Sequence, residues 1–114
     1  MYPPEHTTMH IFNKSSKVWE AKYAGQEHNF KIFIASTQLT PAMVMENVLR
    51  KRGDEAQGWA LTEVMEAGNG CWVKGSTIEY GSERAKGSLA SMGWTGKRGE
   101  KDGLPPVWCV VHKV

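Results

Sequence analysis

The side chains in this sequence that could do chemistry are mainly basic ones in its first half. Residues 14–52 hold seven Lys or Arg against three Asp or Glu, whereas residues 53–96 hold three against six. Basic groups gathered on one face attract carboxylates, so this distribution favours a face that meets an acidic partner. Scattered, solvated charge would give the same counts. The candidate partner-binding residues are five basic side chains and one aromatic: Lys17, Lys22, Lys31, Phe33, Arg50 and Lys51.

Other kinds of site find little support in the residue pattern. The serines lack a glycine-elbow context, and no pair of acids stands out for general acid–base catalysis. Residues 70–76 imitate a phosphate-binding loop only in part, because no lysine follows the second glycine. His6 and His10 have a spacing that could hold a metal on a helix, but no third ligand accompanies them. We expect no enzyme, no metal and no cofactor.

Nucleic-acid binding is also not expected. The formal net charge is only +2, and the second half of the chain is acidic. The five tryptophans fall in or beside apolar runs, so most of them should belong to the core rather than stack on bases.

The clearest structural element is a helix predicted from Thr40 to Gly53. The Thr40 hydroxyl can cap its first turn, and Pro41 suits the first helical position. Gly53 can take the left-handed conformation that ends a helix. Residues 50–52 would then lie in the last turn, where cations offset the helix dipole as well as serving a partner. The apolar stripe that should pack on a sheet is Val44, Met45, Val48 and Leu49.

A β-hairpin is predicted before this helix. Residues 17–24 and 29–36 both alternate between apolar and polar side chains, with a turn between them. We expect the second strand to bury Phe30, Ile32 and Ile34 and to expose Lys31 and Phe33. Residues 1–16 are predicted to be a flexible lead-in, and residues 17–114 a single domain.

The second half of the chain should complete the sheet. The expected elements are strands at 59–65 and 71–74 joined by an Asn-Gly turn, a loop at 75–81, a weak helix at 82–92, a mobile connection at 95–104 and a strand at 107–112. The last strand is apolar on both faces, which indicates a central position between the first and third strands. The predicted fold is therefore α+β, a β-grasp (ubiquitin-like) mixed sheet of about five strands with one main helix across it and a short second helix.

The cysteines and the hydropathy pattern bear on the compartment. Cys71 and Cys109 each lie in an apolar, strand-like run, so two buried free thiols and a cytoplasmic location are expected. No segment has the length of a membrane span, and residues 1–16 lack the apolar core of a signal peptide.

The pattern resembles a Ras-association domain, the ubiquitin-like module of small-GTPase effectors. The resemblance runs from about residue 17 to residue 112. It rests on the strings KVWEA (17–21), FKIFI (30–34), LTPAMVMENVLRKR (39–52) and WALTEV (59–64). The region from 75 to 94 and the loop to 104 are longer than a minimal member of the family needs, and KGST (74–77) stands where many relatives have acidic residues.

The resemblance implies a binding mode. The second strand of such a domain pairs with an edge strand of a GTP-bound Ras-family GTPase, and basic residues meet acids of its switch region. Carried onto this sequence, Lys17, Lys22 and Lys31 match the strand positions, and Arg50 and Lys51 match the helix. The expected function is thus a non-catalytic signalling module that reaches membranes only through its partner. The alternative is a ubiquitin-like interaction or self-association module that binds no GTPase, with its own copy or a neighbouring domain of a larger protein as its partner. Lysine on an edge strand could equally serve to prevent aggregation.

Overall fold

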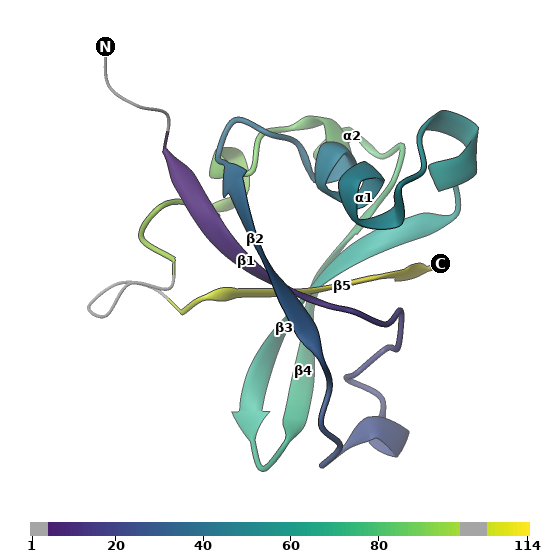
Figure 1. Cartoon of the computed structure of the whole chain (residues 1–114), viewed down its shortest axis with the longest axis vertical. Coiled ribbons are helices and arrows are strands. Elements are labelled where there is room, and N and C mark those ends of the chain that lie inside the picture. Colours follow the sequence, from purple (N-terminus) through teal and green to yellow (C-terminus); the bar gives the residue numbers. More distant parts are fainter. Residues whose placement is uncertain (1–4, 99–104) are drawn as a thin grey trace.

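Five strands form one mixed sheet in the computed structural model, which describes residues 5–98 and 105–114 (Figure 1). The strand order is β2-β1-β5-β3-β4. The central pair β1 and β5 is parallel, and the other neighbours are antiparallel. The strands are β1 (His6–Phe12), β2 (Phe30–Ser36), β3 (Trp59–Gly68), β4 (Cys71–Glu79) and β5 (Val107–Lys113). The α+β class and the central position of the last strand are as predicted.

The main helix α1 (Pro41–Leu49) begins where the sequence indicates. The Thr40 hydroxyl accepts a hydrogen bond from the Met43 N–H at 3.2 Å, and Pro41 occupies the first turn. The predicted end is wrong, because Arg50 already adopts the left-handed conformation (φ 57°) and its N–H donates to the Glu46 carbonyl. Residues 50–52 therefore follow the helix and do not lie in its last turn. Gly53 begins a short 3-10 helix, η2 (Gly53–Ala56).

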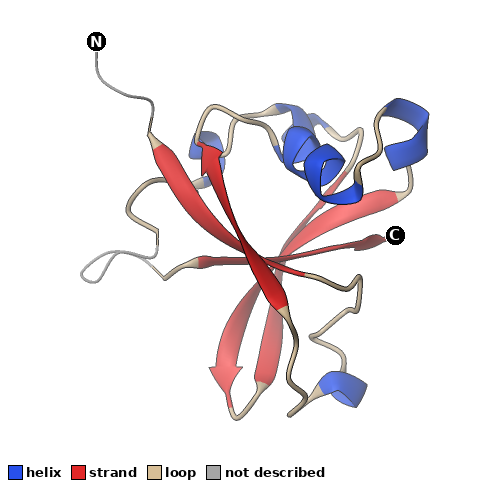
Figure 2. Ribbon diagram, in the orientation of Figure 1, coloured by secondary structure: helices blue, strands red, loops and turns tan. Residues whose placement is uncertain are grey.

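The larger apolar core lies between the sheet and its helices. Figures 1 and 2 show α1 and α2 (Glu83–Lys86) together on one side of the twisted sheet. Val44 and Met45 of α1 are fully buried, and Val48 and Leu49 pack at the margin of the same core. The strands contribute alternate side chains to this face, among them Met9, Ile11, Leu61, Cys109 and Val111.

The opposite face of the sheet carries a second, smaller apolar cluster. Phe12, Val64 and Val110 form it together with Val18, and three tryptophans pack around them: Trp19, Trp72 and Trp108. The connection between β1 and β2, which includes the 3-10 helix η1 (Ala21–Tyr23), places Val18 and Trp19 on this face.

The predicted first strand is wrong. Residues 17–24 form this covering connection, and the strand that pairs with β2 is β1, within the stretch predicted as a flexible lead-in. The alternation of Thr7, Met9 and Ile11 with Thr8, His10 and Phe12 is that of a strand, but its threonines and histidines made it look polar. Residues 1–4 of the lead-in lie outside the described residues. A domain boundary at residue 16 does not hold, because β1 lies inside the sheet.

The predicted apolar faces of β2 are exchanged, although Lys31 is exposed as predicted. Phe30, Ile32 and Ile34 are exposed, with 44%, 61% and 66% of their surfaces accessible. Phe33 and Ala35 face the helix instead, opposite Met9 and Thr7 of β1. Alternation defines two faces of a strand but does not tell which of them the helix will cover.

The other differences between the predicted and the observed elements concern their lengths. β4 continues to Glu79 through most of the predicted loop at 75–81, and the predicted helix at 82–92 is reduced to α2 and the 3-10 helix η3 (Ala90–Met92). Of the connection predicted to be mobile, residues 99–104 lie outside the described residues. Before them, Arg98 is held by an ion pair with Glu63 at 2.7 Å.

Both cysteines are free thiols, as expected. Cys109 is buried, whereas Cys71 is only half-buried, contrary to the prediction. Among the described residues, no helix has the length and apolar character needed to cross a membrane.

A candidate interaction edge on β2

Within the described residues, the outer edge of β2 has backbone groups that no neighbouring strand pairs with. β2 ends the sheet, and no other strand of residues 5–98 and 105–114 pairs with its outer side. Two hydrogen bonds flank its regular ladder with β1, from Asn13 N–H to the Asn29 carbonyl and from Thr37 N–H to the Glu5 carbonyl, both 2.9 Å. Because hydrogen-bonded pairs alternate along an antiparallel ladder, Lys31, Phe33 and Ala35 direct their backbone groups toward β1.

The other residues of β2 direct their N–H and C=O groups outward. Three of them, Phe30, Ile32 and Ile34, are the residues whose apolar side chains are exposed, and the fourth, Ser36, has its carbonyl bonded to the Leu39 N–H at 3.0 Å. A strand that offers both free hydrogen-bonding groups and apolar side chains can pair with a strand of another chain. β2 therefore has what strand addition requires.

The exposed apolar surface continues from β2 toward the centre of the sheet. Phe30 packs edge-on against Trp108 with ring centroids 4.7 Å apart. The ring of His10, on the strand between them, is stacked on Trp108 at 4.3 Å and 18°. These contacts fix the orientation of the Phe30 ring, so a partner would meet a partly ordered surface.

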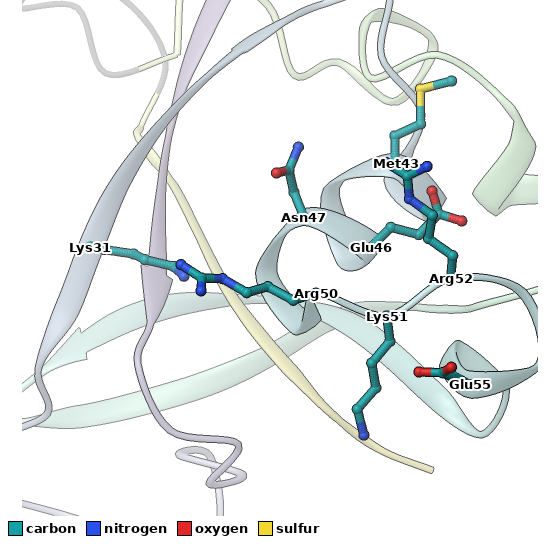
Figure 3. A pocket seen from close by; sticks show the side chains of 8 residues that line it. All are labelled: Lys31, Met43, Glu46, Asn47, Arg50, Lys51, Arg52 and Glu55. Atoms are coloured by element: carbon teal, nitrogen blue, oxygen red, sulfur yellow. The ribbon is translucent and has the colours of Figure 1, made fainter.

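A basic hollow lies on the other face of β2, beside α1 (Figure 3). It has a volume of about 730 Å³ and is lined by Lys31, Met43, Glu46, Asn47, Arg50, Lys51, Arg52 and Glu55. Figure 3 shows the side chains of Lys31 and Arg50 extended toward one another, from β2 and from the end of α1. Four basic groups against two carboxylates give this hollow a positive charge next to the free edge.

One of the two carboxylates is already engaged. The Tyr80 hydroxyl donates a 2.6 Å hydrogen bond to Glu46 Oε2 and accepts one from the Gly53 N–H at 3.1 Å. The bond to the Glu46 carboxylate is the main reason why the pKa of Tyr80 is raised. Glu46 is thereby directed to Tyr80.

The structure brings together only some of the predicted site residues. Lys31, Arg50 and Lys51 line the same hollow, although Figure 3 shows Lys51 pointing away from the other two. Its ammonium group lies 5.4 Å from the centre of the Trp59 ring. Phe33 is half-buried against the main core, where it serves the fold.

The two remaining lysines do not line the hollow. Lys17 and Lys22 belong to the connection that covers the opposite face, and neither is on a strand. Lys22 lies 4.0 Å from the Glu20 carboxylate and over the ring of Tyr23. Their expected place beside Lys31 depended on a first strand at 17–24, which the chain does not form.

Sequence reasoning also missed residues of the edge. Phe30, Ile32 and Ile34 were assigned to the core, and Arg52 was not among the candidates. The alternating pattern that marks the three apolar residues was present, but only the pairing of β2 with β1 decides that they face outward.

A buried histidine lies on the same face as the second apolar cluster. His112 Nδ1 donates to the Lys113 carbonyl at 2.8 Å, so Nε2 accepts from the Thr62 hydroxyl at 2.7 Å, and Thr62 lies 2.9 Å from the Thr77 hydroxyl. Burial lowers the pKa of His112, and the positive charges of Lys17 and Lys74 add to this effect. The histidine is used within the fold rather than presented to a ligand.

No protein-family model, curated protein or solved structure matches this chain.

Proposed function

We propose that the chain is a non-catalytic signalling module with a β-grasp, ubiquitin-like fold that binds a GTP-loaded Ras-family small GTPase. The order β2-β1-β5-β3-β4, with a parallel central pair and a helix across one face, supports the β-grasp assignment. The GTPase assignment follows from the resemblance to Ras-association domains, in which the second strand meets the partner.

The observation that carries the proposal is the free edge of β2 with a basic hollow beside it. A partner strand would add to β2 through the outward backbone groups of Phe30, Ile32 and Ile34. Lys31 and Arg50, on the helix side of that edge, would face the acidic side chains that flank the partner strand. Backbone pairing supplies contact area, and the basic residues speed encounter and select an acidic partner.

This arrangement reduces the number of basic residues that would contact the partner. Lys31 and Arg50 carry the interaction, and Lys51 and Arg52 add to the positive potential of the hollow. Lys17 and Lys22 contribute little, because they lie on the covering connection of the opposite face. The module acts in the cytoplasm and reaches a membrane through the GTPase.

The test is a calorimetric titration of the chain with a panel of Ras-family proteins. Each protein is loaded in turn with a non-hydrolysable GTP analogue and with GDP. The proposal expects binding to at least one GTP-loaded protein and much weaker binding to its GDP form. The GTPase assignment fails if no protein of the panel binds in either state.

A further inference from the structure

The free edge of β2 is complementary to itself. Its three outward apolar residues, Phe30, Ile32 and Ile34, are evenly spaced about Ile32, and their side chains share one exposed face. In an antiparallel pair related by a two-fold axis, one residue lies opposite its own copy and the others are exchanged symmetrically. The carbonyl of Ser36, the fourth outward residue of β2, already accepts from the Leu39 N–H at 3.0 Å. An axis at Ile32 is therefore the choice that pairs the three apolar residues with one another, whereas an axis at Phe33 would place Phe30 opposite Ser36.

We propose that two copies of this chain associate through β2 in this register and so join their sheets. Ile32 lies opposite Ile32 of the second copy, and Phe30 lies opposite Ile34. Each of these pairs is a hydrogen-bonded pair, because the backbone groups of all three residues point out of the sheet. Their apolar side chains, now exposed, cover one another across the new pair.

The charged side chains on the helix-side face of β2 are compatible with this register. Lys31 lies opposite Phe33 of the second copy and not opposite its own copy. The two Lys31 side chains are diagonal neighbours, at about 7–8 Å between their backbones, and their exposed ammonium groups can diverge into solvent. Salt should therefore leave the dimer unchanged or strengthen it, because it screens this residual repulsion.

The dimer and the GTPase complex would use the same strand. Self-association would hide the edge from a GTPase, so the two complexes exclude one another. The inference rests on the free edge that the proposed function also uses, but not on the identity of any partner.

The first test is sedimentation equilibrium of the chain alone over a wide range of protein concentration. We expect a reversible monomer–dimer equilibrium that is not weakened by salt. A chain that stays monomeric at every concentration overturns the proposal. This measurement contains no GTPase, so its outcome is independent of the titrations that test the proposed function.

A charge-swap experiment tests the register. I32K and I32E each place like charges directly opposite one another, so each variant alone should dimerise at least tenfold more weakly. An equimolar mixture of the two places Lys opposite Glu and should restore association. Because Ile32 is 61% exposed, neither change should unfold the chain, and circular dichroism checks this.

Ile34 provides the matched control. In the proposed register it lies opposite Phe30, so mixing I34K with I34E brings no opposite charges together and should restore nothing. Rescue at position 34 rather than 32, or undiminished dimerisation of I32K and I32E, overturns the register.

Discussion

The hydroxyl of Tyr80 lies 2.6 Å from Oε2 of Glu46 and ties the chain after β4 to the helix α1. Because the same hydroxyl also accepts from the Gly53 N–H, one phenol fixes both the helix and the turn that follows it. Glu46 lines the basic hollow, so the shape of the hollow depends in part on Tyr80, a residue outside the predicted site.

This bond should be visible in the titration of Tyr80. The Glu46 carboxylate raises the pKa of Tyr80 above its usual 10.0, so the protonated phenol is favoured in the folded state. Its contribution to stability is complete below pH 10 and is lost as the pH rises through the folded pKa. NMR titration should place Tyr80 above 10, and Glu46→Gln should bring its pKa down. An unchanged value in that variant would contradict the assigned cause.

His112 gives stability the opposite pH dependence. Burial lowers its pKa in the folded state below 6.5, so the unfolded chain binds the proton more readily. Its contribution is complete above about pH 6.5, the unfolded value, and is lost as the pH falls through the folded pKa. Urea unfolding across this range should show the loss in the parent chain, and His112→Gln should flatten it. If the free energy of unfolding of that variant falls with pH as steeply as that of the parent chain, other groups are responsible for the loss.

Two lysines provide a matched pair for the proposed GTPase interaction. Lys31→Glu reverses a charge in the hollow beside the free edge, whereas Lys22→Glu makes the same change on the covering connection. We expect Lys31→Glu to weaken binding by about 1.4 kcal/mol or more, a factor of ten, and Lys22→Glu to change it little. Raising the salt concentration should weaken binding by the parent chain. Equal effects of the two variants would show that general charge, and not this hollow, attracts the partner.

Arg50 combines backbone strain with a binding role, and substitution can separate them. Its φ of 57° costs a residue with a side chain about 1 kcal/mol, which glycine avoids. Arg50→Gly should therefore raise the free energy of unfolding by up to that amount while weakening GTPase binding. Arg50→Lys keeps both the strain and the charge, so it should leave stability and binding close to those of the parent. A loss of stability in Arg50→Gly would contradict the strain argument.

Removal of residues 1–12 tests the assignment of the first strand. β1 lies between β2 and β5 and contributes Met9 and Ile11, both fully buried, to the main core. The truncated chain should lose its cooperative unfolding transition, since β2 would have no strand to pair with. Met9→Ala is the milder counterpart and should cost about 2–5 kcal/mol while keeping the fold. A truncated chain with native circular dichroism and a sharp transition would restore the lead-in interpretation.

The sequence predicts best those elements that local interactions determine. Thr40 and Pro41 mark the start of α1 because a cap and a first-turn proline act within a few residues. The last strand is placed correctly because a strand in the centre of a covered sheet is apolar on both faces, and residues 107–112 show this pattern in the sequence itself.

The elements that were predicted wrongly depend on pairing between strands that are far apart in the sequence. The connection at 17–24 alternates like a strand, yet Val18 and Trp19 are used to cover the second apolar cluster. The faces of β2 depend on its partner β1, which the sequence did not reveal as a strand. Lys31 and Arg50, the candidates that depended on β2 and α1, line one hollow. Lys17 and Lys22, whose expected place depended on the first strand, lie on the covering connection instead.

The parallel pairing of β1 with β5 also constrains how the chain can fold. His10 and Val107 are 97 residues apart in sequence, yet the His10 ring contacts the Val107 carbonyl at 3.4 Å. On the ribosome, β1 emerges early and must wait for β5 to be synthesised before the centre of the sheet can close. Until then β1 lacks its parallel neighbour, and closing so long a loop makes folding slow compared with a helical bundle.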